Sequence, residues 1–314
     1  MIINSKEAFN ILQGLDDILI LTHSSPDGDA IGSAYGLCHI LRGLGKRAAV
    51  LTDTVAKTLS FAADKSFALD FEPQAVVTTD VADIKLIPDD YKNYAERGVI
   101  LAIDHHTANK AFAENTLLDS KAAAACQVIY DMLTENAVAI DKAAANCLYL
   151  GIATDTGCFR YSNTAPATLR AAAALIEAGA DNARINNDIF ETQSPAVMDF
   201  ETEALCSMTY HFDGRCALMV LPQDMYKKHG VTTADTTGIA ALTRRREGVL
   251  VGVVLKETEK GSWKVSMRSN EPVSAAEICM SLGGGGHRLA AGAELFTTLN
   301  EAKKELLDAI EKAL

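Results

Sequence analysis

Short apolar runs alternate with longer amphipathic segments between residues 17 and 178. The apolar runs have the length of buried strands, and the apolar positions of the longer segments recur with helical spacing. Strands and helices that alternate in this way predict a parallel sheet with helices on both faces. The expected strands are 17–22, 48–51, 75–79 and 99–103, and the expected helices are 30–44, 121–136, 141–153 and 165–178.

The last hundred residues have a different pattern, in which strands come first and helices follow. Strands are expected at 217–221, 249–256 and 263–268, helices at 274–281 and 299–314, and a loop or helix start at the polar cluster 232–237. We therefore predict an α/β protein with two domains, residues 1–185 and 209–314, joined by a helical connection over 186–208. Because ligands of parallel sheets bind at the carboxyl ends of the strands, candidate chemistry is sought there first.

Composition agrees with a folded protein of two domains. The 314 residues are 48% hydrophobic and 22% charged, which excludes global disorder. The N-terminus lacks a signal-peptide pattern, and no apolar run approaches the length of a membrane span, so a cytoplasmic protein is expected. Seven scattered cysteines without a C-x-x-C pair predict small core residues rather than disulfides or a zinc site.

The net charge of −12 bears on the partners. Binding to a long polyanion depends on neutralising many phosphates with Lys and Arg. An acidic chain therefore favours a short phosphorylated substrate over duplex nucleic acid. The sequence leaves a monomer and a homodimer both open.

The first group of candidate chemical residues follows the first predicted strand. His23 precedes Asp27 by four residues, and Asp27 and Asp29 flank a glycine at the start of a predicted helix. Divalent metals bind such mixtures of imidazole and carboxylate. Asp29 is also a good helix N-cap, and Asp-Gly marks turns, so the residues by themselves leave a capping role open.

Two further groups favour metal binding. Asp104, His105 and His106 follow a buried-strand pattern, where a parallel sheet places its site. Asp155 stands near the end of an otherwise apolar helix, and a buried carboxylate is costly unless it is paired or bound to metal. A solvated loop for the histidines and a capped turn for Asp155 are the weaker interpretations.

A glycine cluster lies within the second domain. Gly283 to Gly286 precede His287, and successive glycines allow backbone N–H groups to approach an anion closely. A flexible linker is the alternative. Arg268 and Ser269 end a predicted strand, and the Arg268 guanidinium is suited to a forked contact with phosphate, although it is equally compatible with an ordinary surface position.

Taken in order, these motifs and the segment Thr-Asp-Thr-Gly-Cys-Phe-Arg-Tyr at 154–161 resemble the DHH phosphoesterases. Within them the resemblance is to the branch that combines oligoribonuclease activity with hydrolysis of 3′-phosphoadenosine 5′-phosphate (pAp). It extends from residue 18 to residue 296. The resemblance implies a parallel-sheet DHH domain, a smaller DHH-associated α/β domain that binds substrate, and an active site in the cleft between them.

The resemblance also implies two manganese ions, with Mg²⁺ or Co²⁺ as alternatives. One ion would be bound by His23 and Asp27 and the other by Asp29, His105 and Asp155. Asp80 would bridge the two, although its Thr-Thr-Asp motif departs from the family pattern and Asp53 competes for the role. Asp104 would orient a histidine and His106 would contact phosphate. The implied substrate-binding residues are Arg268, Ser269, Gly284, Gly285, Gly286 and His287.

The implied activity is metal-dependent hydrolysis of short oligoribonucleotides, including dinucleotides, or of pAp. A phosphodiesterase for cyclic or linear dinucleotides is a variant of the same function. The Gly-Gly-Gly-Gly-His motif disfavours an inorganic pyrophosphatase, and the acidic charge and short chain disfavour a processive exonuclease. The complete set of metal motifs argues against a nucleotide-binding protein without activity.

Overall fold

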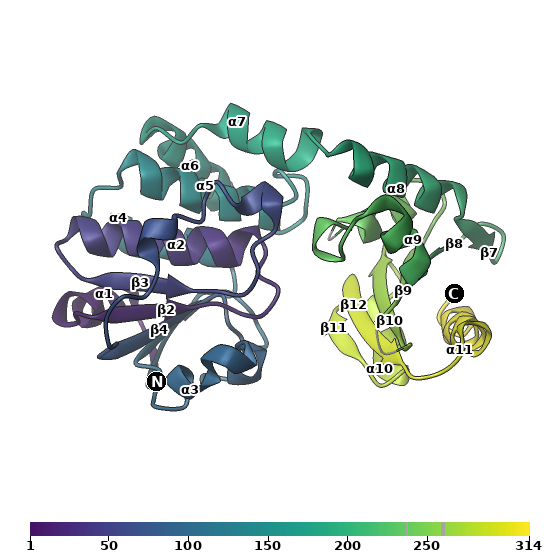
Figure 1. The fold of residues 1–314 in the computed structure, drawn as a ribbon, viewed down its shortest axis with the longest axis horizontal. Helices are drawn as coiled ribbons and strands as arrows, with labels where there is room; N and C mark the ends of the chain where they lie inside the picture. The colour runs from purple at the N-terminus through teal and green to yellow at the C-terminus, as the bar shows by residue number, and fades with distance from the viewer. Residues whose placement is uncertain (237, 259–260) are drawn as a thin grey trace. The chain divides into compact units, whose positions relative to one another are not determined.

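In the computed structural model, the chain forms two compact units, Met1–Thr192 and Gln193–Leu314. Residues 1–236, 238–258 and 261–314 are described here. Each unit is built on its own six-stranded sheet (Figure 1). Among the described residues, no helix combines the length and the apolar character needed to cross a membrane.

The sheet of the first unit has the strand order β1-β6-β5-β4-β2-β3, and its strand pairs are parallel. The four predicted strands are confirmed as β2, β3, β4 and β5. Sequence analysis did not predict β1 and β6, because both are very short and β6 is half polar. The bounds are β1 Ile2–Ile3, β2 Ile18–Leu21, β3 Ala48–Leu51, β4 Ala75–Thr79, β5 Leu101–Asp104 and β6 Asn115–Leu118.

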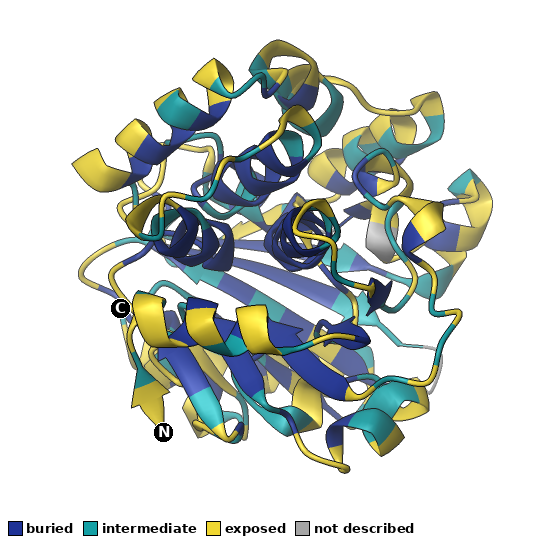
Figure 2. Cartoon of the chain, turned by 90° about the vertical axis from the view of Figure 1, so that its left-hand side faces the viewer, coloured by how far each residue is buried: buried dark blue, intermediate teal, exposed yellow. Residues whose placement is uncertain are grey.

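One face of this sheet is covered by long helices. Ile18 and Ile20 face this layer, whereas Leu19 and Leu21 face the opposite side, as the period of a strand requires. In Figure 2 the strands and the helices packed on them are largely buried, while the outer helices are exposed on one side. These helices are α1 Ser5–Gly14, α2 Gly28–Gly43, α4 Ala125–Glu135, α5 Lys142–Asp155 and α6 Pro166–Glu177.

We expected helices on the opposite face of the sheet as well, but only short helical segments cover it. The connection between β4 and β5 forms the short 3₁₀ turns η3 (Ile84–Leu86) and η4 (Asp89–Tyr91) and the four-residue helix α3 (Lys92–Ala95). Pro88 and the polar residues after it interrupt this connection, so it has too few consecutive helix-forming positions for a long helix.

Helices α2 and α5 pack with their backbones unusually close together. A Cβ atom on Gly28 would lie 2.4 Å from the Thr154 side chain, and one on Gly32 would lie 2.3 Å from the carbonyl oxygen of Cys147. With Gly36, these glycines recur every four residues on one side of α2, where only glycine fits. The contact brings the first turn of α2 next to the last turn of α5, which carries Asp155.

The sheet of the second unit has the order β11-β12-β10-β9-β8-β7 and is antiparallel except for β8 with β9. Helices α10 (Ala275–Ser281) and α11 (Leu299–Glu311) pack on one face, through a core that includes Trp263, Val265 and Met267. The bounds of the strands are β7 Thr209–His211, β8 Cys216–Leu221, β9 Val251–Glu257, β10 Trp263–Ser269, β11 Gly285–His287 and β12 Ala290–Leu295.

The other face is covered over β8 and β9 by α8 (Pro195–Cys206), α9 (Gln223–His229) and the 3₁₀ helix η7 (Ile239–Arg244). Part of the predicted connection 186–208 is thus α8, whose Phe200 and Ala204 lie in the core of the second unit. The rest includes the π-helical turn η5 (Asn187–Glu191), which follows α7 (Asn182–Asn186) in the first unit. The predicted loop 232–237 contains a 3₁₀ turn at Ala234–Thr236, and Thr237 lies outside the described residues.

Candidate metal centre

Three neighbouring strands of the first unit end at the same edge of the sheet. His23 lies just beyond β2, Asp80 directly after β4, and His105 directly after β5. Since β4 lies between β2 and β5 in the sheet, Asp80 lies between the two histidines. The first turn of α2 and the last residue of α5 add Asp29 and Asp155 to this edge.

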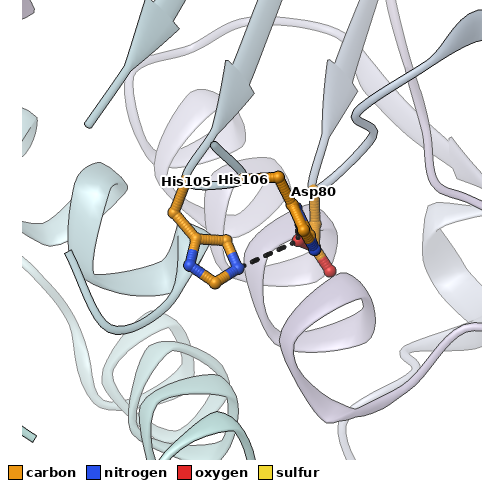
Figure 3. Close-up of side chains that lie close together, drawn as sticks. All are labelled: Asp80, His105 and His106. Atoms are coloured by element: carbon orange, nitrogen blue, oxygen red, sulfur yellow. Dashed lines mark ion pairs between the residues drawn. The ribbon is translucent and has the colours of Figure 1, made fainter. Parts of the chain in front are cut away.

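Asp80 is the central residue of this cluster. It is buried and has left-handed backbone geometry, with φ of 59°. Its Oδ2 lies 3.5 Å from His23 Nε2. Its Oδ1 lies 3.6 Å from His105 Nε2 and 3.5 Å from His106 Nδ1, and Figure 3 shows these three side chains. Oδ1 accepts no hydrogen bond from the described residues. A buried carboxylate oxygen without a donor is costly, so the position suits a cation.

Three groups of side chains each have ligand atoms within 4.8 Å of one another: His23 with Asp27 and Asp80, Asp29 with His105 and Asp155, and Asp80 with His105 and His106. In the first group, His23 Nε2 lies 4.0 Å from Asp27 Oδ1. In the second, His105 Nε2 lies 3.8 Å from Asp29 Oδ2 and 3.3 Å from Asp155 Oδ2. Imidazole nitrogens and carboxylate oxygens are ligands for divalent metals, so the donor set fits the two ions that the resemblance implies.

Asp27 and Asp29 of the first motif have different roles in the structure. Asp27 is the N-cap of α2, and its Oδ1 accepts hydrogen bonds from the N–H groups of Asp29 and Ala30. The capping role considered for Asp29 is therefore wrong. Asp29 is fully buried and accepts hydrogen bonds from Ala125 N at 2.6 Å and Cys126 N at 2.9 Å, at the start of α4.

Burial and mutual repulsion perturb the carboxylates. Burial raises the pKa of Asp80 well above its ordinary value, and the charges of Asp29 and Asp27 raise it further. The pKa of Asp155 is raised well above its ordinary value by the same causes, and burial also raises the pKa of Asp29. A divalent cation among these groups would reverse the effect, because it favours their ionised forms.

Asp104 holds the loop that carries the two histidines. Its Oδ1 accepts hydrogen bonds from His105 N at 2.8 Å and His106 Nδ1 at 2.8 Å, and its Oδ2 accepts one from Asn109 Nδ2 at 2.5 Å. Burial opposes ionisation of Asp104, but the bonds from His106 and Asn109 outweigh it and lower the pKa of the carboxyl. The same bond to Asp104 raises the pKa of His106.

Asp53, the competitor for the bridging role, lies in a different environment. Its Oδ2 accepts a hydrogen bond from Ser25 N at 3.2 Å, and its Oδ1 accepts one from Thr54 N at 2.7 Å. It belongs to none of the three groups of clustered ligands. The structure thus brings Asp80, rather than Asp53, to the histidines.

Several supporting groups were not found by sequence analysis. Asn109 bonds Asp104, and Asn163 donates to the carbonyl oxygens of Asp155 at 3.1 Å and Ala123 at 3.2 Å. The backbone N–H groups that bind Asp29 have no side-chain signature at all. The four-residue spacing of Gly28, Gly32 and Gly36 was a visible signal of close helix packing.

A cavity of about 280 Å³ opens beside the cluster. His23, Asp27, Asp80, His106 and Asp155 line it. A larger cavity of about 590 Å³ in the same unit lies near the start of α5 and contains none of the predicted ligands. Chemistry rather than size therefore identifies the smaller cavity as the candidate site.

The predicted substrate residues of the second unit have different surroundings. Arg268 is half-buried on β10, whereas Ser269 is buried and its Oγ accepts a hydrogen bond from Ala275 N at 3.1 Å. Gly285 to His287 form the exposed edge strand β11, so the alternative of a flexible linker is wrong. A Cβ on Gly284 would lie 2.0 Å from the Gly292 carbonyl oxygen, which explains the need for glycine there.

Comparison with known proteins identifies the family. Residues 17–152 match the DHH family, N-terminal domain, and residues 215–314 match the DHHA1 domain. The bifunctional oligoribonuclease and PAP phosphatase NrnA of Thermus thermophilus is 34% identical over 298 residues, which cover 95% of this chain and 90% of that protein. The chain belongs to the DHH family.

Solved structures agree with this assignment to the DHH family. An exopolyphosphatase-related protein from Bacteroides fragilis is 25% identical, with a TM-score of 0.88 over 98% of this chain and 95% of that chain. RecJ from Thermus thermophilus, solved with Mn²⁺, has a TM-score of 0.57 at 14% identity and covers 98% of this chain and 55% of its own. The RecJ comparison shows that the fold is shared.

Proposed function

We propose that this DHH protein hydrolyses phosphate esters of short oligoribonucleotides and of pAp, with a pair of divalent metal ions. The observation that carries the proposal is the position of Asp80. One of its oxygens faces His23 and the other faces His105, and each histidine belongs to a separate set of carboxylates. The substrate class comes from the relative in Thermus thermophilus, which is named for these two activities.

In this proposal His23 and Asp27 would hold one metal ion, Asp29, His105 and Asp155 would hold the other, and Asp80 would contribute to both sites. The ions supply Lewis-acid stabilisation of phosphoryl charge and activation of water. Asp29 is fixed by the N–H groups of α4, and His105 is restrained by the Asp104 loop, so the ligands are preorganised.

His106 has a separate role in the proposal. Its Nδ1 is bonded to Asp104, and this bond raises the pKa of the imidazole, so the ring keeps its proton to higher pH than an isolated histidine. His106 also lines the cavity beside the cluster. Its Nε2 is therefore suited to donate a hydrogen bond to a phosphoryl oxygen or a proton to the leaving group.

A side-by-side assay tests the function. The purified chain, freed of metal and then supplied with Mn²⁺, Mg²⁺ or Co²⁺, is incubated with pAp, a 5′-phosphorylated dinucleotide, a cyclic dinucleotide and pyrophosphate. We expect release of phosphate from pAp and of mononucleotides from the linear dinucleotide, with Mn²⁺ the most effective ion. Turnover confined to pyrophosphate, or equal turnover without added metal, would contradict the proposal.

A further inference from the structure

The larger cavity of the first unit, of about 590 Å³, lies away from the metal centre. It is lined by residues 60–65, the start of α5, α7, and His39 near the end of α2. His39 is eleven residues from the first residue of α2, and Lys142 is thirteen residues from Asp155 at the end of α5. At 1.5 Å per helical residue, these separations are about 16 and 20 Å. We call this space the α5 cavity.

The buried side of the α5 cavity is apolar. Ala62, Cys147 and Ile185 line it and belong to the hydrophobic core of the first unit. Phe61 is half-buried against the same core, and the guanidinium carbon of Arg184 lies 5.7 Å from the centre of its ring. Ligand sites of roughly 300–1,000 Å³ combine such apolar walls with a few polar groups. This side of the cavity therefore suits a flat apolar group such as a nucleobase.

The exposed side of the α5 cavity carries three cations. Lys65, Lys142 and Arg184 line the cavity, and all three are exposed. Arg184 Nε lies 3.5 Å from Asp188 Oδ2, whereas neither lysine forms an ion pair within residues 1–236, 238–258 and 261–314. The chain as a whole has a net charge of −12, so three cations around one cavity indicate an anionic ligand.

Two carboxylates also line the α5 cavity, and both cap helical turns. Asp64 Oδ1 accepts a hydrogen bond from Ser66 N at 2.8 Å at the start of the 3₁₀ turn η2 (Lys65–Phe67). Asp181 Oδ1 accepts one from Arg184 N at 3.1 Å at the start of α7. The capping bonds account for these two carboxylates without a ligand. No such role accounts for the two lysines.

His39 adds a polar group to the wall of the α5 cavity. It is half-buried, and its ring meets the Phe67 ring edge-on, with 4.5 Å between the ring centres. In the part of the chain that the structure describes, neither ring nitrogen has a hydrogen-bond partner. Burial lowers the pKa of His39, although Asp141 and Asp64 act in the opposite direction, so the ring is neutral at pH 7. A neutral imidazole offers one donor and one acceptor, which suits the polar edge of a nucleobase.

We propose that the α5 cavity binds a nucleoside monophosphate, with the phosphate at Lys65, Lys142 and Arg184 and the base on the apolar side. The site is separate from the proposed catalysis, because it shares no residue with the metal centre. Since α2 and α5 continue from the cavity to the ends that carry metal ligands, a ligand bound here stabilises the folded helix pair.

Binding of adenosine monophosphate (AMP) tests the site. AMP, adenosine and inorganic phosphate are titrated by calorimetry into the full-length chain in EDTA, which removes metal ions. An Arg268→Ala background removes the predicted phosphate contact of the second unit. In this background, Lys142→Gln removes one cation, and Ala143→Trp fills the cavity without a change of charge. The matched control is Lys57→Gln, which removes an exposed lysine of the neighbouring 3₁₀ turn η1, outside the cavity lining.

We expect one AMP to bind per chain, at least tenfold more tightly than adenosine or phosphate. Lys142→Gln should weaken the binding of AMP about tenfold, because a charge-assisted contact with phosphate is lost. Ala143→Trp should abolish binding, and Lys57→Gln should leave it unchanged. AMP should also raise the melting temperature of the control but not that of Ala143→Trp, which shows in the same measurement that each variant is folded.

Three results would overturn the site. The first is no binding of AMP in EDTA by the wild type, and the second is loss of binding in Arg268→Ala, which would move the ligand to the second unit. The third is unchanged affinity in folded Lys142→Gln and Ala143→Trp. Equal affinities for AMP and phosphate would reject a nucleoside monophosphate as the ligand. Hydrolysis of pAp with Mn²⁺ by a chain that fails these tests would retain the proposed function and lose only the α5 cavity.

Discussion

The two units each gather groups of like charge, but of opposite sign. At the edge of the first sheet, Asp29, Asp80 and Asp155 are buried close together, and burial raises the pKa of each. On the second sheet, Lys256 lies beside Lys264 and Arg268, and burial with these charges lowers its pKa. In both places the charged form is disfavoured until a ligand of opposite charge is present.

The two regions differ in how many contacts fix their charged side chains in place. The carboxylates are fixed by backbone N–H groups, by two helices in close contact and by the Asp104 loop. Lys256 is half-buried on β9 and Lys264 is exposed on β10, and neither has a comparable set of hydrogen bonds among the described residues. Fixed ligands of this kind are what a metal site requires.

The strongest test of the acidic region compares Asp80→Asn with Asp53→Asn. Removing the carboxylate that faces both histidines should lower Mn²⁺-dependent turnover of pAp roughly a thousandfold. This factor corresponds to about 4 kcal/mol of lost transition-state stabilisation. Asp53 accepts bonds only from the backbone N–H groups of Ser25 and Thr54 and lies outside the ligand groups, so its variant should stay within about threefold. If only Asp53→Asn abolished turnover, the assignment of the bridging residue would be reversed.

A smaller loss is expected from Asp104→Asn. The amide would still occupy the space but would weaken the bond to His106 Nδ1, which orients the imidazole. Loss of a partner that orients a ligand costs roughly 10–100-fold in activity. Steady-state kinetics against pH should also show the alkaline limb, where His106 loses its proton, at lower pH, since the bond that raises its pKa is weakened. A variant with the wild-type profile would remove Asp104 from this role.

The close contact of α2 and α5 can be tested by stability. Gly32→Ala places a Cβ 2.3 Å from the Cys147 carbonyl oxygen, and overpacking of this kind costs about 1–3 kcal/mol. Gly43→Ala, at the end of the same helix with nothing within 4 Å, is the control and should be neutral. The measurement is denaturant unfolding of both variants. Equal stability would mean that the helices separate easily and do not set the spacing of Asp29 and Asp155.

The smallest expected effect is the contribution of Lys256 to the pH dependence of stability. Lys256 has a folded pKa of about 8, below its unfolded value near 10.4. The unfolded chain binds more protons between these values, so stability rises with pH in that window and the full penalty applies below pH 8. Lys256→Met should therefore raise the melting temperature by a few degrees at pH 7, and by less at pH 9.5. A gain that is independent of pH would show that packing, not charge, is responsible.

Local patterns in the sequence were sufficient for much of the fold. The strands β2 to β5 of the first unit and the helices α2, α4, α5 and α6 were predicted because their apolar patterns are long enough to be distinctive. The two shortest strands, β1 and β6, were missed because a run of two to four residues carries too little pattern. The strand β11 was also missed, because only its pairing with β12 shows that a Cβ at Gly286 would lie 2.6 Å from Ala291 Cα.

By itself the sequence determined which residue types were available at the ends of the strands, and hence that His23, Asp80 and His105 were candidates for one site. Tertiary structure decided that β4 lies between β2 and β5, so that each oxygen of Asp80 faces a different histidine while Asp53 accepts bonds from the backbone of Ser25 and Thr54. It also decided the register that sets Lys256 against Lys264. The physical reason is the same in both cases: periodicity and residue type are local properties, whereas strand order and cross-strand register depend on contacts between distant segments.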